Sequence, residues 1–307
     1  MDIFLQQLIN GLVLGAIYAL VALGYTMVYG ILGLINFAHG DIVMVGALVT
    51  LTVVQALVGS TVHPLAIIVL AMAAAILVCV AIGVTAERVA YRPLRRAPRL
   101  APLITAIGLS ILIQYSAALV WGKQYISMPE IITPTLLRIG GAQLTDLQAY
   151  IFALACAIMG ALLWLIKSSR IGRAMRATEQ NPEIAGLMGV DTNRVIAFTF
   201  VIGSAIGAIA GVMVVLYYGL GHYSMGFMLG LKAFTAAVLG GIGNVAGAML
   251  GGLLLGVIES IVSGYIGDWT GGLLGSNYRD IFAFLVLILV LVLRPSGLMG
   301  RPSGERA

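Results

Sequence analysis

Residues 64–99 have the sequence PLAIIVLAMAAAILVCVAIGVTAERVAYRPLRRAPR, an apolar run that ends at a cluster of arginines. About 20 apolar residues are enough for an α-helix to cross the hydrocarbon core of a bilayer. Short translocated loops avoid Lys and Arg, so arginines that follow an apolar run mark the cytoplasmic end of a span. We therefore expect residues 64–85 to cross a membrane and residues 88–99 to lie in the cytoplasm.

The composition of the whole chain indicates the same class of protein. Of its 307 residues, 61% are hydrophobic and 9% are charged, and the mean hydropathy is +1.06. A soluble domain could not cover its surface with so little charge. The net charge of +5 does not indicate nucleic-acid binding, because the basic residues flank apolar runs and aromatic residues are not interleaved with them.

Apolar runs of similar length recur along the chain. The first follows no basic segment, so we expect it to be retained and not cleaved as a signal peptide. The Gly-rich residues 228–266 should form two short or broken helices that cross twice or re-enter as a hairpin. We predict an all-α polytopic transmembrane helix bundle of about eight to ten membrane segments, in one domain over residues 1–307. The other predicted spans are residues 8–29, 37–58, 100–121, 147–166, 195–218 and 280–293.

The distribution of basic residues predicts the orientation. Of the 17 Lys and Arg residues, 13 fall in residues 88–99, in residues 167–194, or at Arg294, Arg301 and Arg306. With these three patches in the cytoplasm, counting spans places the N-terminus outside and the C-terminus inside.

Motifs for catalysis are absent. The sequence has no P-loop for ATP, no G-x-S-x-G and no H-E-x-x-H, and its three histidines are far apart. Residues 241–246 match the dinucleotide fingerprint in form, but they lie in an apolar stretch without the βαβ unit that the fingerprint needs. We expect no catalytic residue, metal site or cofactor in this chain. Cys79 and Cys156 lie in apolar runs, and we expect both to be buried.

Two polar interruptions are candidates for the translocation pathway. Residues 32–40 and 239–247 resemble each other when one-residue gaps are allowed, and both place Gly and Asn within apolar sequence. Such breaks at membrane depth need protein or water to satisfy the backbone, and paired breaks suggest an inverted repeat, although Gly-rich chains also align by chance. The candidate residues, expected near the middle of the bundle, are Asn36, His39, Gly241, Gly243 and Asn244.

Other polar residues and many glycines occur within the spans. Asp41, Lys232 and Glu259 are costly in lipid, so they should face the bundle interior or an interface; alternatively, Asp41 and Lys232 lie near the headgroups. Glycines spaced four residues apart should allow close helix packing. These glycines are Gly203, Gly207 and Gly211, then Gly247 with Gly251, and Gly252 with Gly256.

The loop over residues 167–194 contains a predicted short helix. Asn181 and Pro182 would open it, and Gly189 would end it. Its apolar face should contact a partner, the bilayer or its own bundle. The residues assigned to coupling with a partner are Arg173, Arg176, Glu183, Ile184, Leu187 and Met188.

Several motifs resemble those of the branched-chain amino-acid ABC permeases. Residues 18–20 (YAL), 24–30 (GYTMVYG) and 35–41 (INFAHGD) resemble the family's N-terminal signature, and residues 87–95 (ERVAYRPLR) its first cytoplasmic loop. Residues 172–189 resemble its ATPase-docking loop, and residues 232–243 (KAFTAAVLGGIG) its late Gly-rich motif. The resemblance runs from about residue 5 to residue 302 and is closest to the first permease subunit of leucine, isoleucine and valine importers. Residues 122–148 carry no family motif.

This resemblance implies half of an importer in the bacterial inner membrane. A second, related permease would pair with this chain, two ABC ATPase subunits would use ATP, and an extracytoplasmic binding protein would deliver the amino acid. Urea, short amides or other neutral amino acids are alternative substrates. A gradient-driven transporter or channel, or a scaffolding subunit, is the alternative from a different class.

Overall fold

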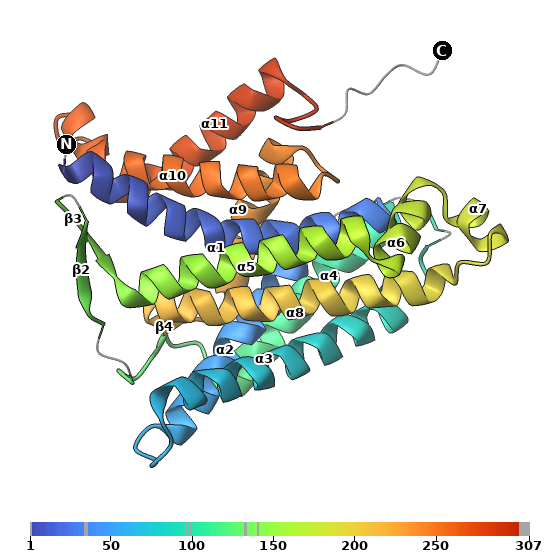
Figure 1. Cartoon of the computed structure of the whole chain (residues 1–307), viewed down its shortest axis with the longest axis horizontal. Helices are drawn as coiled ribbons and strands as arrows, with labels where there is room; N and C mark the ends of the chain where they lie inside the picture. Colours follow the sequence, from blue (N-terminus) through green and yellow to red (C-terminus); the bar gives the residue numbers. More distant parts are fainter. Residues whose placement is uncertain are drawn as a thin grey trace. The chain divides into compact units, whose positions relative to one another are not determined.

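The computed structural model describes residues 2–33, 36–95, 97–98, 100–131, 134–139 and 141–300 (Figure 1). Four arginines of the predicted basic patches, Arg96, Arg99, Arg301 and Arg306, lie outside the described residues, as do Leu34 and Ile35. Within this part of the chain, seven helices are long and apolar enough to cross a membrane. They confirm the prediction of a polytopic helical membrane bundle.

The long apolar helices follow the predicted spans closely. Helix α4 has the predicted bounds, and a π-helix, η1 (Glu87–Tyr91), extends α3 beyond its predicted end. The seven are α1 (Asp2–Leu32), α2 (His39–Leu57), α3 (Pro64–Ala86), α4 (Leu100–Trp121), α5 (Asp146–Ser168), α8 (Thr192–Tyr218) and α10 (Val245–Trp269).

Shorter helices complete the chain. The Gly-rich stretch forms two helices, α9 (Met225–Gly240) and α10, as predicted, and the last predicted span is α11 (Arg279–Leu293), preceded by the turn η2 (Ser276–Tyr278). The basic loop holds α6 (Arg170–Gln180), which was not predicted, and α7 (Pro182–Leu187), which was.

Two small antiparallel sheets were not predicted. Strand β1 (Ile126–Ser127) pairs with β4 (Leu220–Gly221), and β2 (Leu136–Ile139) pairs with β3 (Ala142–Thr145) in a hairpin with Leu136 opposite Thr145. Their strands have at most four residues each, too few for an alternating pattern to be recognised in a polar loop.

The helices gather into two compact units. One unit comprises Met1–Thr26, Pro134–Met159 and Lys232–Ala307, and we call it the terminal unit. The other comprises Met27–Thr133 and Gly160–Leu231, and we call it the central unit. The single domain proposed from the sequence stays a prediction.

In the central unit, α2, α3 and α8 pack against one another (Figure 1). A β-carbon on Gly211 of α8 would collide with the backbone of α2 at Val43, and one on Gly207 would lie 3.3 Å from the His39 ring. Gly207 and Gly211 therefore serve close packing, as predicted, and the same role for Gly203 stays a prediction. Cys79 is buried in this unit, whereas Cys156 on α5 is exposed, so the expected burial of Cys156 is wrong.

In the terminal unit, α10 is the common packing partner. A β-carbon on Gly252 or Gly256 would collide with α1 at Ala19 or Gly15, and one on Gly251 would collide with α9 at Ala236. Gly247 lies against Gly240 in the same way. Both predicted glycine pairs of α10 thus allow backbone approach, where van der Waals packing replaces the hydrophobic drive that lipid lacks.

Candidate functional site

The short helix α7 forms because the sequence supplies both of its caps. The Asn181 side chain accepts hydrogen bonds from the backbone N–H groups of Glu183 and Ile184, each at 3.0 Å, and Pro182 occupies the first turn. Gly189, just past the end, has φ of 85°, a left-handed conformation that glycine adopts without steric cost. The predicted helix is confirmed at both ends.

The predicted apolar face of α7 is open. Leu187 is 87% exposed, Met188 is 80% exposed and Ile184 is 57% exposed, whereas Ala185 on the opposite side is buried. The alternative in which this face folds back onto its own bundle is therefore wrong. Three neighbouring exposed apolar side chains on a capped helix mark a contact surface.

The polar residues assigned to coupling divide into two groups. Glu183 is exposed, and Arg173 is exposed with a hydrogen bond to the backbone carbonyl of Ser168 at 3.4 Å. The guanidinium of Arg176 instead donates to the backbone carbonyl of Ile166 at the end of α5. Arg176 thus fixes α6 to α5.

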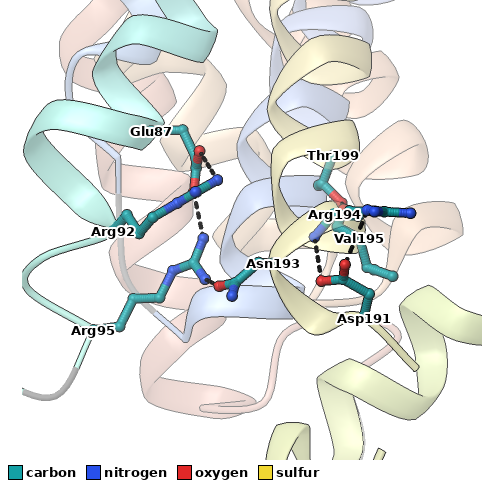
Figure 2. Close-up of polar contacts among 8 residues, drawn as sticks. All are labelled: Glu87, Arg92, Arg95, Asp191, Asn193, Arg194, Val195 and Thr199. Atoms are coloured by element: carbon teal, nitrogen blue, oxygen red, sulfur yellow. Dashed lines mark hydrogen bonds and ion pairs between the residues drawn. The ribbon is translucent and has the colours of Figure 1, made fainter. Parts of the chain in front are cut away.

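A buried carboxylate connects the end of the α3–η1 helix to the start of α8 (Figure 2). Glu87 is fully buried and accepts two hydrogen bonds from Arg92, at 3.1 and 3.0 Å, and a third from Arg95. Arg95 also donates to the side chain of Asn193 in the first turn of α8, at 2.5 Å. Because α7 leads directly into α8, this network joins the first basic loop to the part of the chain that follows α7.

Charge and burial act differently on the two arginines. The hydrogen bonds and charge of Glu87 raise the pKa of Arg92, whereas burial lowers the pKa of Arg95 despite the same partner. Both guanidinium groups stay charged at neutral pH, because an arginine pKa lies above about 12.

Figure 2 also shows Asp191 at the start of α8. Its carboxylate caps the helix by accepting a hydrogen bond from the backbone N–H of Arg194 at 3.1 Å, and it forms an ion pair with the exposed Arg194 side chain at 2.9 Å.

The first polar interruption lies inside the central unit. Asn36 is buried and accepts a hydrogen bond of 2.6 Å from the Tyr91 hydroxyl, and the Tyr91 ring contacts Phe200 of α8. His39, the first residue of α2, is buried against α8. The expected interior location of both residues is confirmed, and their role in a pathway stays a prediction.

The second polar interruption has the expected backbone conformation. Gly241 and Gly243 have φ of 109° and 86°, and the Asn244 side chain caps α10 by accepting from the Gly247 N–H at 3.0 Å. Asn244 also donates to the backbone carbonyl of Met299 at 2.9 Å.

This interruption lies at the ends of α9 and α10, against the segment that follows α11. The N–H groups of Leu298 and Met299 donate to the carbonyls of Leu239 and Gly240, each at 2.9 Å. Arg294, just before this segment, marks a membrane boundary by the charge rule. Residues 241–244 thus connect two helix ends, as a break between helices requires, and their expected position near the middle of the bundle stays a prediction.

A cluster of charged residues lies inside the terminal unit. Lys232 of α9 pairs with Glu259 of α10 at 2.8 Å and with Asp280 of α11 at 2.8 Å, and Arg279 reaches Glu259 at 3.1 Å. The Tyr18 hydroxyl of α1 donates to Glu259 at 2.9 Å. The cluster therefore joins four helices.

Sequence patterns indicated only part of this cluster. Lys232 and Glu259 were predicted to face the interior, and both are buried. The contributions of Tyr18, Arg279 and Asp280 were missed. An Arg–Asp pair at the start of an apolar run is an ordinary boundary signal, and nothing local shows that these side chains reach α9 and α10.

The fold defines an integral membrane protein of the polytopic helical class, with an exposed, capped segment between two of its spans. The chain matches the family described as "Branched-chain amino acid transport system / permease component" over residues 7–291. It belongs to that family.

Several relatives are similar along nearly the whole chain. The "High-affinity branched-chain amino acid transport system permease protein LivH" of Escherichia coli (strain K12) is 45% identical over 99% of this chain and 97% of its own length. LivH of Salmonella typhimurium has the same identity and coverage. The corresponding protein BraD of Pseudomonas aeruginosa is 44% identical over 99% of this chain and 98% of its own length.

Proposed function

We propose that this chain is a transmembrane permease subunit of an ATP-binding-cassette importer for branched-chain amino acids. The observation that carries the proposal is the 45% identity, over 99% of the chain, to permeases named for that transport. The substrates are leucine, isoleucine and valine. The chain itself forms half of the translocation pathway and performs no chemical reaction.

Other subunits supply energy and substrate. A second, related permease completes the pathway, two ATPase subunits bind and hydrolyse ATP, and an extracytoplasmic binding protein delivers the amino acid. The exposed apolar face of α7 supports this proposal, because three exposed side chains on a rigid helix fit a groove on a partner.

Helix α7 couples the chain to an ATPase subunit. Ile184, Leu187 and Met188 fill a groove on the ATPase, and Arg173 and Glu183 contribute at its rim, where single polar contacts are worth little. Burial of the three apolar side chains contributes roughly 4–6 kcal/mol before the costs of association.

The contacts of the α7 segment provide a route for the motion. Asp191 caps α8 directly after α7, and Asn193 connects α8 through Arg95 to Glu87. A displacement of α7 by the ATPase would therefore move the ends of α8 and of the α3–η1 helix together. These are the helices that pack around α2 in the central unit.

We place the chain in the inner membrane with its N-terminus outside and its C-terminus in the cytoplasm. Contacts within the central unit support this layout, because segments assigned to one side lie together: Arg95 with Asn193 inside, and β1 with β4 outside. A single cysteine at Glu183, in a background without Cys79 and Cys156, should resist an impermeant thiol reagent in whole cells, and one at Leu273 should react. Labelling at position 183 from outside would overturn the orientation.

Uptake by the reconstituted complex tests the proposed function. Proteoliposomes that contain both permeases and the ATPase should accumulate radiolabelled leucine only with the loaded binding protein and internal ATP. Excess isoleucine or valine should compete, and urea or acetamide should not. Accumulation driven by an ion gradient without ATP, or transport of urea in place of leucine, would contradict the proposal.

Leu187→Asp tests the coupling. The charge would enter the ATPase groove and leave the membrane helices untouched, so the variant should insert normally, lose ATPase co-purification and lose leucine uptake. Leu273→Asp is a matched control, because Leu273 is also 87% exposed but lies outside the coupling segment. Normal ATPase co-purification with Leu187→Asp would mean that α7 lies on the membrane surface.

A further inference from the structure

Asp41 is a buried carboxylate that the chain itself does not neutralise. It lies in the first turn of α2 and is 0% exposed. Neither of its oxygens has a hydrogen-bond partner among the described residues, and no ion pair joins it to a lysine or arginine there. The alternative in which Asp41 lies exposed near the headgroups is therefore wrong.

An ionised carboxylate without a partner is among the most costly groups to bury. Ionisable residues within membrane spans generally face a bundle interior or cavity and mark the path of a substrate or ion. The hydrophobic core cluster that includes the next residue, Ile42, is made of apolar side chains and supplies no partner for a charge. A ligand that brings a positive charge would supply the missing partner.

The groups next to Asp41 suit one kind of cation. Ser110 and Gln114 of α4 lie beside the carboxylate without closing a hydrogen bond of normal geometry to it, and Gln114 donates to Ser110 at 3.2 Å. The carboxylate and the Ser110 hydroxyl oxygen can both accept hydrogen bonds, and the Gln114 amide lies beside them. A primary ammonium group has three N–H donors and no acceptor, so it matches them.

Close helix approach shapes the remaining side. A β-carbon on Gly226, in the first turn of α9, would lie 2.7 Å from the Asp41 carboxylate. Glycine at this position lets the backbone of α9 pack closely against the carboxylate. Asp41 is thus enclosed by α2, α4 and the start of α9.

We propose that Asp41, together with Ser110 and Gln114, forms the subsite that receives the α-ammonium group of the amino acid on its way through this chain. This inference rests on the proposed function. It also gives the chain a means to favour zwitterionic amino acids over neutral urea or amides, which cannot compensate a buried negative charge.

Transport by Asp41→Asn in the reconstituted complex is the main test. Asn keeps the shape and removes the charge, so leucine transport should fall at least about tenfold, which corresponds to about 1.4 kcal/mol. ATP hydrolysis stimulated by the loaded binding protein should stay within about twofold of wild type. Thr50→Val is a matched control on the same helix, because Thr50 is also buried and its hydroxyl donates to the Gly46 carbonyl within α2; it should transport normally.

Two further measurements decide the matter if Asp41→Asn does not insert. Ser110→Ala and Gln114→Leu change no charge and should each lower leucine transport severalfold. Isoamylamine inside the vesicles, which keeps the ammonium group and the aliphatic chain of leucine, should inhibit wild-type transport, and 4-methylpentanoate should not.

The outcomes separate the two proposals. If the wild-type complex does not transport leucine, the proposed function is wrong. If the wild type transports leucine and Asp41→Asn does so equally well, or if Ser110→Ala and Gln114→Leu are both normal, the subsite is wrong and the proposed function stands.

Discussion

Glu259 in the terminal unit and Asp41 in the central unit are both acidic residues buried within membrane helices, but their surroundings are opposite. Glu259 is 1% exposed and contacts Lys232, Arg279 and the Tyr18 hydroxyl. Asp41 is 0% exposed, has no cationic partner among the described residues, and has only the neutral side chains of Ser110 and Gln114 beside it. The comparison teaches that burial of a charge does not by itself indicate its role: a satisfied charge holds helices together, and an unsatisfied one is available to a ligand.

Lys232→Met should have the largest effect on stability. Removal of the lysine leaves Arg279 as the remaining cationic neighbour of Glu259 and Asp280, and breaking a buried ion pair on one side costs about 3–5 kcal/mol. Denaturant titration in detergent micelles measures this loss. The double variant Lys232→Met/Glu259→Gln should recover part of it, and a single variant as stable as wild type would show that the cluster does not hold the helices.

Glu87→Gln tests whether a buried carboxylate stabilises the fold because it is paired with cations, and not because of the unit in which it lies. Glu87 is buried in the central unit like Asp41, but it accepts hydrogen bonds from two arginines. Loss of these charged hydrogen bonds should lower the free energy of unfolding by about 1.5–3 kcal/mol.

Asp191→Asn is the control for Glu87→Gln. Asn caps a helix as well as Asp, and the Asp191–Arg194 pair is exposed, so its loss should cost less than about 1 kcal/mol. Equal losses from the two variants would mean that burial of the pair is unimportant.

Two glycines of the second helix interruption test how much backbone packing, as opposed to charge, stabilises the terminal unit. Gly241→Ala would strain a left-handed backbone and place a β-carbon 2.5 Å from the Gly300 nitrogen. Gly243→Ala would strain the backbone alone, because the space beside Gly243 is open. We expect a cost of about 1–2 kcal/mol for Gly243→Ala and a larger one for Gly241→Ala, measured by the same titration. Equal costs would show that the contact with the segment after α11 contributes nothing.

The sequence was sufficient to predict features that depend on local chemistry. An apolar run of membrane length predicts its own helix, as at residues 100–121, and Asn181, Pro182 and Gly189 predict α7 because capping involves near neighbours. Polar residues in spans predicted an interior location for Asn36, His39, Lys232 and Glu259 because lipid cannot solvate them.

Features that depend on distant partners could not be predicted. Tyr18 lies 241 residues from Glu259 in the sequence, and Asn193 lies 98 residues from Arg95. The π-helix at Glu87–Tyr91 continues an apolar run whose sequence is that of an ordinary α-helix. It could therefore not be predicted, nor could the pairing of Glu87 with the arginines that follow it. The depth of residues 241–244 in the membrane is not encoded locally, because glycine and asparagine favour a break at a helix end as much as one at mid-membrane.

The most direct test of the contrast measures Asp41→Asn and Glu259→Gln side by side, in both unfolding and leucine uptake. Glu259→Gln should lose stability, because Lys232 and Arg279 each lose one of their anionic partners. Asp41→Asn should unfold at the same denaturant concentration as wild type or a higher one, because it removes an uncompensated buried charge, and yet its leucine uptake should fall at least about tenfold. If Asp41→Asn loses stability as Glu259→Gln does and keeps wild-type uptake when folded, Asp41 is part of the scaffold and the contrast is wrong.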